Sequence, residues 1–417
     1  MKYIANKQDW IGSFGPRAIR TALASVAALA SCALWSTAMQ AQTYTVLYSF
    51  TGGADGGVVI GGLIQDSSGN LYGTTSAGGN SSCSVINPGC GVVFKLSPTG
   101  EETVLYTFNG GTDGAMPQAG VIRDAHGNLY GTTARGGNPS CAWGNGTGCG
   151  TIFKIDPTGR ETVLYRFNGG QDGAVPAAPL YRDSSGNLWG TTQFEGFAGS
   201  QCFPGPGCGT LFRLDPKGKL TAYMFKGPPT DGYWPLGGVI ADSAGNLYGT
   251  TNFGGTNNSG IIFKVSTSGR ISTLYTFDVN TGDGAGPTGL LLSGGQLYGP
   301  TTGGGAQQTG AVFQLGAAGE KVLYSFGITN GFSYTPQGVM ARDASGNLYG
   351  TASISGDFGF LYRLDSKGNF TDLHDFFGPP DGEMPMAGVI MDSAGNLYGT
   401  TQSGGNPGPG TIFKYTP

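Results

Sequence analysis

Apolar and polar positions along this chain form short strand-like runs, and the runs recur in an unchanged order. The segment LYG, or LWG, recurs at intervals of 58, 59, 59, 50, 51 and 49 positions. It begins at Leu71, Leu129, Leu188, Leu247, Leu297, Leu348 and Leu397. A repeat of this length is typical of propellers and solenoids, in which each unit packs against its neighbours.

Three further apolar segments accompany each LYG segment. A GVI-type segment precedes it, a VVFKL-type segment follows it, and a VLYSF-type segment ends the repeat. The VVFKL type is centred on Phe94, Phe153, Phe212, Phe263, Phe313, Tyr362 and Phe413, and the VLYSF type ends at Phe50, Phe108, Phe167, Phe225, Phe277, Phe326 and Phe376. Four strands per repeat is the number in a propeller blade. Because these runs are apolar on nearly every residue, both faces of each blade should be buried, with Leu71 and Tyr72 pointing into opposite seams.

Turn sequences separate the predicted strands. D-x-x-G-N, as in Asp66 to Asn70, lies between the first two strands of a blade, and P-T-G or K-G lies between the last two. The Asp can bond the backbone of the turn, and the Gly tolerates a positive φ. Both connections are therefore predicted to be tight hairpins.

The two ends of the repeat array predict how the ring closes. The first strand, Val46 to Phe50, is of the last type in a blade, and the final strand, Gly410 to Tyr415, is of the third type. Together they complete seven of each strand, so the N-terminal strand should be the outer strand of the last blade, leaving no free edge. The sequence predicts an all-β fold, a seven-bladed β-propeller of four-stranded blades closed in this way.

Residues 1–41 differ from the repeats and predict export. Four basic residues precede an apolar stretch from Thr21 to Met39, which is the pattern of a secretory signal peptide, with cleavage expected near Ala41. Residues 42–417 would then form one propeller domain. Two alternatives stay open, a lipid on Cys32, which follows small residues, and an uncleaved anchor.

Composition narrows the class of partner. The 417 residues include 79 Gly, 22 Lys and Arg, and 26 Asp and Glu. Without residues 1–41, which hold four bases and one acid, 18 basic and 25 acidic residues leave a net charge of −7. This argues against nucleic acid and anionic membrane surfaces. No later run approaches the roughly 20 apolar residues of a membrane span. We expect a secreted monomer whose partner is an extracellular glycan or protein, with no cofactor.

The repeat elements resemble a known family. SGNLYGTT, GTIFKIDPTG and TVLYSF, with GG-x-DG between them, resemble the GloVer tandem repeat of the choice-of-anchor family of exported bacterial proteins. The resemblance covers about residues 43–417 and implies an extracytoplasmic propeller, often followed by a C-terminal sorting signal that is not seen after Tyr415. It implies no particular activity. More distantly, D-x-x-G-N-L-Y is similar to the blade turn of NHL-type propellers.

Six cysteines after the signal form three close pairs. They are Cys83 and Cys90, Cys141 and Cys149, and Cys202 and Cys208. Each pair lies in an insertion between the second and third strands of blades 1 to 3. Three local disulfides are predicted in an exported chain, each contributing about 2 to 3 kcal/mol on the chain-entropy model. A zinc site is disfavoured, because no C-x-x-C spacing and no nearby His occur.

Two groups of titratable residues could carry chemistry. The loop entering each blade contains Asp-Gly, at Asp55, Asp113, Asp172, Asp231, Asp283 and Asp381, with Asn330 and Gly331 in the remaining blade. These could form a ring of cation ligands, but a turn repeated by symmetry is favoured. The two histidines, His126 in a turn and His374 in a slot held elsewhere by Tyr, are too few for a His-centred hydrolase or lyase.

A function should lie where the repeat is broken, because residues shared by every blade serve the framework. Such positions gather in loops on one face around blades 2 to 4. They are Arg135, Trp143, Phe194, Glu195, Tyr233, Trp234 and Phe253. Rings beside a carboxylate and a guanidinium suit sugar or peptide surfaces, although the interpretation that these rings cap the disulfide-bearing insertions is favoured.

Two functions therefore stay open. The first is an exported binding or scaffold module, and the alternative is a cofactor-independent carbohydrate-active enzyme that uses carboxylates of the loop face. Glycosidase chemistry needs two carboxyl groups at a defined separation. The two hypotheses differ in whether such a pair converges over the mouth of the channel.

Overall fold

A computed structural model describes residues 42–83, 89–141, 146–196, 202, 207–229, 231–329, 332–354 and 358–417. The predicted signal peptide, residues 1–41, lies outside this part, as do Trp143, Asn330 and Gly331. Residues Thr43–Thr416 form one compact unit.

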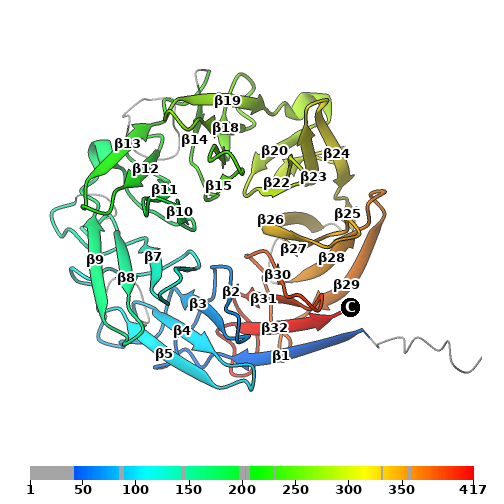
Figure 1. Ribbon diagram of the computed structural model, residues 1–417. Helices are drawn as coiled ribbons and strands as arrows, with labels where there is room; N and C mark the ends of the chain where they lie inside the picture. Colours follow the sequence, from blue (N-terminus) through cyan, green and yellow to red (C-terminus); the bar gives the residue numbers. More distant parts are fainter. Residues whose placement is uncertain are drawn as a thin grey trace, which may run out of the picture. The chain divides into compact units, whose positions relative to one another are not determined.

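Seven antiparallel sheets, one for each repeat, are arranged as a ring around a central channel (Figure 1). Blade 1 contains β2 (Ile64–Gln65), β3 (Leu71–Thr75), β4 (Val92–Leu96) and β5 (Glu102–Thr107). Blade 2 contains β6 (Ile122–Arg123), β7 (Leu129–Thr133), β8 (Thr151–Ile155) and β9 (Glu161–Arg166). Blade 3 contains β10 (Tyr181–Arg182), β11 (Leu188–Thr192), β12 (Thr210–Leu214) and β13 (Leu220–Met224), and is preceded by the 3₁₀ turn η2 (Gly170–Asp172).

The other four blades follow the same order. Blade 4 contains β15 (Ile240–Ala241), β16 (Leu247–Thr251), β18 (Ile261–Val265) and β19 (Ile271–Thr276), with a small outer ladder of β14 (Gly232–Tyr233) and β17 (Phe253–Gly254). After η3 (Val279–Thr281), blade 5 contains β20 (Gly284–Pro287), β21 (Leu291–Ser293), β22 (Gln296–Gly304), β23 (Ala311–Gly316) and β24 (Gly319–Ser325). Blade 6 contains β25 (Ile328–Thr329), β26 (Phe332–Arg342), β27 (Leu348–Ile354), β28 (Gly359–Leu364) and β29 (Phe370–Phe376). Blade 7 contains β30 (Ile390–Met391), β31 (Leu397–Thr401), β32 (Thr411–Thr416) and, from the other end of the chain, β1 (Thr43–Ser49). The predicted seven-bladed propeller is confirmed.

The hydrophobic core is divided among the seams between blades. Leu71 packs with Phe50 and Phe94 in the seam between blades 7 and 1, whereas Tyr72 packs with Phe108 and Phe153 in the next seam. Adjacent residues of one strand thus enter opposite seams, as the apolar runs predicted. Every blade is covered on both faces by its neighbours.

One aromatic pair crosses every seam. A ring at the end of each outer strand meets a ring in the third strand of the next blade. The pairs are Phe50 and Phe94, Phe108 and Phe153, Phe167 and Phe212, Phe225 and Phe263, Phe277 and Phe313, Phe326 and Tyr362, and Phe376 and Phe413, with centroids 5.0 to 5.3 Å apart. The planes are inclined by 50° to 71°; five pairs are edge-to-face and two are tilted. An edge-to-face pair contributes about 0.5 to 1.5 kcal/mol beyond its buried area.

The same ring explains the glycine of LYG. Gly73 lies opposite Phe94 in the antiparallel ladder of β3 and β4. A Cβ on Gly73 would lie 2.6 Å from Cζ of Phe94, and Gly131 has the same relation to Phe153 at 2.5 Å. Any larger residue would displace the seam ring, so the repeat requires glycine here.

Threonine hydroxyls also tie neighbouring blades together beside the channel. Thr74 Oγ1 donates to the carbonyl oxygen of Ala119 in the next blade at 2.8 Å, and Thr351 Oγ1 donates to that of Ala387 at 2.6 Å. Thr400 Oγ1 reaches the carbonyl oxygen of Gly61 at 3.3 Å, across the point where the ends of the chain meet. These bonds satisfy carbonyl groups on the inner strands that have no further strand to pair with.

Closure of the ring occurs as predicted. β1 pairs antiparallel with β32, from Thr43 opposite Thr416 to Ser49 opposite Thr411. Phe50 then enters the seam with blade 1. The first strand therefore covers the outer edge of the last blade and supplies a seam ring at the same time. The described residues include no helix with the length and apolar character needed to cross a bilayer.

Deleting residues Thr43 to Phe50 should destroy the closure, because it exposes the edge of β32 and removes one ring pair. We expect the truncated protein to aggregate or to fail to fold, as measured by size-exclusion chromatography and circular dichroism. An unchanged melting temperature and a monomeric elution volume would contradict the closure.

Candidate functional site

One face of the ring is built by two sets of loops. The loop that enters each blade pairs with the loop between the second and third strands of the same blade, as in the bridges Gly57 with Ala77, Ala115 with Arg135, and Ala174 with Phe194. We call this side the loop face. Of the residues that the sequence singled out for ligand binding, it contains the six that the structure describes: Arg135, Phe194, Glu195, Tyr233, Trp234 and Phe253.

Three aromatic rings from two neighbouring blades lie together on the loop face. The ring of Trp234 lies 5.9 Å from that of Phe194 and 5.5 Å from that of Phe253, with planes inclined by 38° and 24°. All three side chains are half-buried. We call Phe194, Trp234 and Phe253 the ledge. The sequence predicted that these residues share a face, and the structure places their rings in contact.

The framework itself sets the direction of the Trp234 side chain. Trp234 has a φ of 58°, and the equivalent residues Val58, Met116 and Val175 have φ values of 56° to 61°. An apolar side chain fills this slot in each of these blades. Because an indole is much larger than the valine of blades 1 and 3, part of the ring projects beyond the slot towards Phe194 and Phe253.

Beneath the ledge lies the disulfide-bearing core. Tyr233 is only 6% exposed and belongs to the same cluster as Cys202 and Cys208. Tyr233 is therefore a support for the ledge, stacked 5.3 Å below the ring of Phe253, and cannot contact a ligand directly. The capping interpretation thus holds for Tyr233, while the outer parts of the other three rings stay accessible.

Of the two charged candidates, Glu195 adjoins the ledge and Arg135 lies in the preceding blade. Glu195 follows Phe194 directly, has a φ of 61°, and accepts a hydrogen bond from the amide of Gly209 through its carbonyl oxygen at 2.9 Å. Arg135 occupies the position in blade 2 that Phe194 holds in blade 3, and burial lowers the pKa of its guanidinium. The remaining aromatic candidate, Trp143, lies outside the described residues.

All three predicted disulfides are present. Cys83 and Cys90, Cys141 and Cys149, and Cys202 and Cys208 are bonded, with Cα atoms 5.7, 5.9 and 5.1 Å apart. Each closes the loop between the second and third strands of blades 1, 2 and 3. The bonds therefore anchor the part of the loop face that carries the ledge.

The Asp-Gly loops act as repeated turns. Asp113 accepts hydrogen bonds from the hydroxyl of Tyr106 and the amide of Asn109, at 3.1 and 2.9 Å. Asp172 accepts the equivalent bonds from Tyr165 and Asn168. Among the described residues, no three His, Cys, Asp or Glu side chains form a group that could hold a metal ion. The contacts agree with the turn interpretation.

Both histidines occupy framework positions. His126 is exposed in the first hairpin turn of blade 2, where its amide donates to Asp124. His374 fills a tyrosine slot in blade 6, and its Nε2 lies 3.5 Å from a carboxylate oxygen of Asp381, the partner that Tyr has in other blades. Its ring stacks on Tyr44 of β1 at 3.6 Å.

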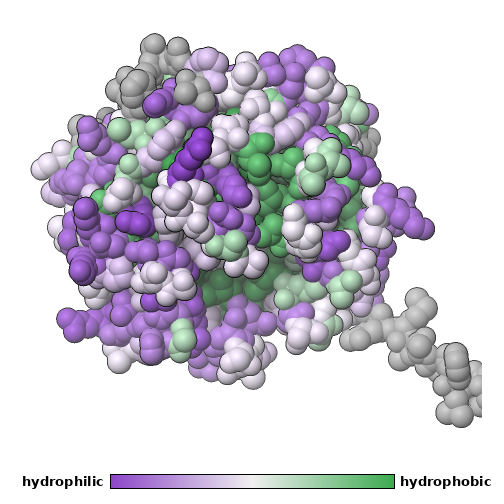
Figure 2. All heavy atoms as spheres, turned by 45° about the horizontal axis from the view of Figure 1, so that its top comes forward, coloured by the Kyte–Doolittle hydropathy of each residue, from purple (hydrophilic) through white to green (hydrophobic). Residues whose placement is uncertain are grey.

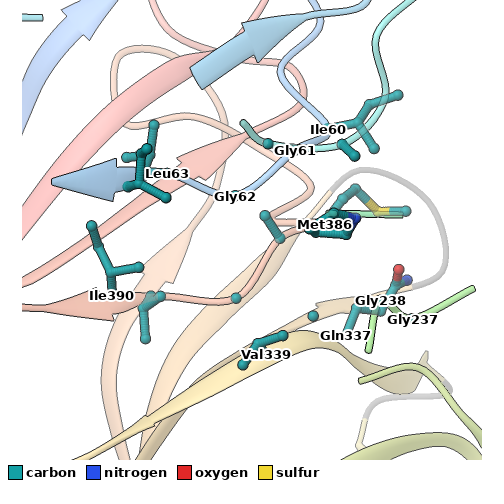
Figure 3. A pocket seen from close by; sticks show the side chains of 18 of the residues that line it. Ile60, Gly61, Gly62, Leu63, Gly237, Gly238, Gln337, Val339, Met386 and Ile390 are labelled. Carbon is teal, nitrogen blue, oxygen red and sulfur yellow. The ribbon is translucent and has the colours of Figure 1, made fainter. Parts of the chain in front are cut away.

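A second feature is the central channel, whose lining residues were not predicted from the sequence. It is a cavity of about 670 Å³ lined by the innermost segments of all seven blades. Apolar residues line the hollow at the centre of the ring (Figure 2), and Ile60, Gln337, Val339 and Met386 border it in the close view (Figure 3). Six of its lining residues are Ile or Leu, and none is acidic among the described residues.

In each blade, the residue two positions after the equivalent of Trp234 lines the channel. We call these seven residues the channel ring: Ile60, Gln118, Ala177, Leu236, Thr288, Gln337 and Met386. In six blades this residue directly follows a proline. Variation is the signal that could have revealed the channel ring. The seven blades use six residue types at this position, whereas the preceding residue is Pro in six blades and the following residue is Gly or Ala in all seven.

The chain belongs to the Gloeobacter/Verrucomicrobia repeat family, whose profile matches residues 33–203, 204–358 and 321–417. Among curated proteins, no sequence matches it. A similar solved structure is the extracellular domain of a protein described as a one-component system from B. thetaiotaomicron, with a TM-score of 0.54 and 13% identity. The match covers 89% of this chain and 40% of that chain, so this chain spans less than half of that domain.

Another similar structure is the periplasmic gluconolactonase PpgL of Pseudomonas aeruginosa. The TM-score is 0.51 and the identity 12%, over 79% of this chain and 92% of that chain. At such identities the likeness shows the propeller fold and nothing about the site.

Three glutamates near the Asp-Gly loops predict how stability depends on pH. Burial, reinforced by Asp55, Asp113 and Asp283 respectively, raises the pKa of Glu102, Glu161 and Glu320 from 4.5 to about 7. Because the folded-state pKa is the higher one, this contribution to stability is complete below about pH 4.5 and is lost as the pH rises through 7.

We therefore expect a melting temperature a few degrees lower at pH 8 than at pH 5. The triple variant Glu102→Gln, Glu161→Gln, Glu320→Gln should show a smaller difference between the two values, because an amide does not titrate. Differential scanning calorimetry measures both. An identical pH dependence in the two proteins would show that these carboxyl groups do not titrate in this range.

Proposed function

We propose that this chain is an extracytoplasmic binding module that holds a glycan on the loop face, over the ledge of Phe194, Trp234 and Phe253. The observation that carries the proposal is the contact of three half-buried rings from two blades at positions where the repeat is broken. Aromatic rings present flat apolar faces against which the C–H face of a sugar can pack. Glu195, beside Phe194, supplies a carboxylate that can accept hydrogen bonds from hydroxyl groups.

Extracytoplasmic location agrees with the three disulfides, because such bonds persist in oxidising compartments. They also fix the loops beneath the rings, which lowers the entropic cost of ordering a binding surface. The similar extracellular domain of the one-component system supports the same compartment. The predicted signal peptide would direct the chain there.

Catalysis is the less favoured alternative. The enzyme hypothesis requires two carboxyl groups that converge over the channel mouth, and the described residues lining the channel include no Asp or Glu. Glu195 stands beside the ledge without a second acidic residue among the ledge residues. A binding role needs no such pair.

The double variant Phe194→Ala, Trp234→Ala tests the proposed site. On an array of glycans and peptidoglycan fragments, we expect the wild type to bind and the variant to lose signal. Each lost ring should weaken binding about five- to a hundredfold, or about 1 to 3 kcal/mol. Isothermal titration with the best array ligand gives the affinities.

Two controls keep this test interpretable. Trp234→Phe keeps a flat ring and should retain most of the affinity, while Phe377→Ala removes a ring that is 68% exposed in blade 6. Binding that survives the double variant, or that is lost with Phe377→Ala instead, would contradict the ledge as the site. Melting temperatures of all variants distinguish lost contacts from lost folding.

A further inference from the structure

We propose that the central channel is a second binding site, separate from the ledge, for a neutral amphiphile whose apolar part enters the channel and whose polar end bonds to the channel ring. Its volume of about 670 Å³ lies in the range of small-molecule sites. The channel is lined by segments of all seven blades, so its walls are fixed by the same seams that hold the propeller together.

The walls select an apolar guest. Val339, on the innermost strand of blade 6, is 43% exposed and lines the cavity (Figure 3). Ile60, Leu236 and Met386 of the channel ring are also only half-buried. An apolar group that entered the channel would remove these side chains from water, which is the usual driving force for such binding.

The charges around the channel disfavour an ion. Arg342 is the one charged residue among the described residues that line it. Its guanidinium already donates to Ser293 Oγ at 3.0 Å and lies 5.2 Å from the ring centroid of Tyr298. Arg123 and Arg182 have the same relation to Tyr72 and Tyr130, so this contact belongs to the framework. An ionic guest would lose its hydration in a channel whose other described lining residues are uncharged, and the single guanidinium already has a hydroxyl group and a ring as partners.

The polar end of the guest is recognised by the channel ring. Two of its members, Gln118 and Gln337 from blades 2 and 6, offer amide groups, and Gln337 Nε2 also donates to Ser353 Oγ at 3.3 Å. The hydroxyl group of a third member, Thr288, is buried in the wall. Amide groups both donate and accept, so they suit a hydroxyl or amide end better than a charged one. The remaining members are apolar. This mixture at one level of the channel matches a molecule with one polar and one apolar end.

Fluorescence of N-phenyl-naphthylamine, a neutral apolar dye, tests the site in the purified protein. We expect the dye to brighten on binding and to be displaced by octyl glucoside below its micelle concentration. Octanoate and octylammonium, of the same chain length but charged, should be at least tenfold weaker competitors. If octanoate or octylammonium displaced the dye as well as octyl glucoside does, the proposal of a neutral guest would be overturned.

A matched pair of variants locates the dye. Val339→Glu places a charge in the channel, and Leu274→Glu places one on β19, where Leu274 is 45% exposed and does not line the cavity. We expect the first change to weaken dye binding at least tenfold and the second to leave it unchanged. Equal effects of the two variants, or no effect of Val339→Glu in a protein with an unchanged melting temperature, would overturn the channel site.

The ledge variant separates this proposal from the previous one. Phe194→Ala, Trp234→Ala should bind the dye with wild-type affinity even where glycan binding is lost, because neither residue lines the channel. Loss of dye binding in that variant would overturn the separate site.

The polar end is tested by the double variant Gln118→Ala, Gln337→Ala, which should weaken the binding of octyl glucoside several-fold more than the binding of the dye. Equal losses of affinity for octyl glucoside and for the dye would show that the channel ring does not bind the polar end of the guest.

Discussion

The contact between two buried aromatic rings with inclined planes, repeated once in each seam, is the interaction on which the propeller depends. In the seam between blades 7 and 1 it joins Phe50, which follows the first strand of the chain, to Phe94. Both rings are fully buried, and the glycine of LYG is required so that the Phe94 ring fits within its own blade. Sheet pairing holds each blade together, whereas these rings hold blade to blade. The ring is complete only because β1 completes the last blade.

A framework fixed at a few repeated positions leaves other positions free to vary. The aromatic ring and the glycine at the seams are fixed by packing between blades, so substitution there affects the whole ring. The side chains of the channel ring and the ledge are not constrained in this way. The backbone two residues before the channel ring has a similar positive φ in most blades, as the values at Val58, Met116 and Trp234 illustrate. Different side chains can therefore be presented from a constant scaffold, which is the arrangement that a family of binding modules needs.

Features with a local sequence signal were predictable, and features that arise from assembly were not. The strand order, the turns and the pairing of Cys83 with Cys90 follow from neighbouring residues or from the repeat itself. The closure followed from counting strands of each type. For the ledge, the shared face was predicted, and the burial of Tyr233 agrees with the capping alternative. Which ring would be buried was not predicted, because it depends on the short ladder that β14 forms with β17. The residues that line the channel were not predicted either, because the innermost strands are often two residues long, as in β2 and β6, and too short to show which side chains face the axis.

The central claim is that the repeated positions build the scaffold while the varying positions of the channel and the loop face bind ligands. The most direct measurement is the anomalous diffraction of a crystal of this protein soaked with an alkyl glucoside that carries bromine at the end of its chain. The account predicts a bromine peak inside the channel, near Val339, with the sugar beside the channel ring. A bromine peak in a seam between blades or on the outer strands, with the channel unoccupied, would contradict it.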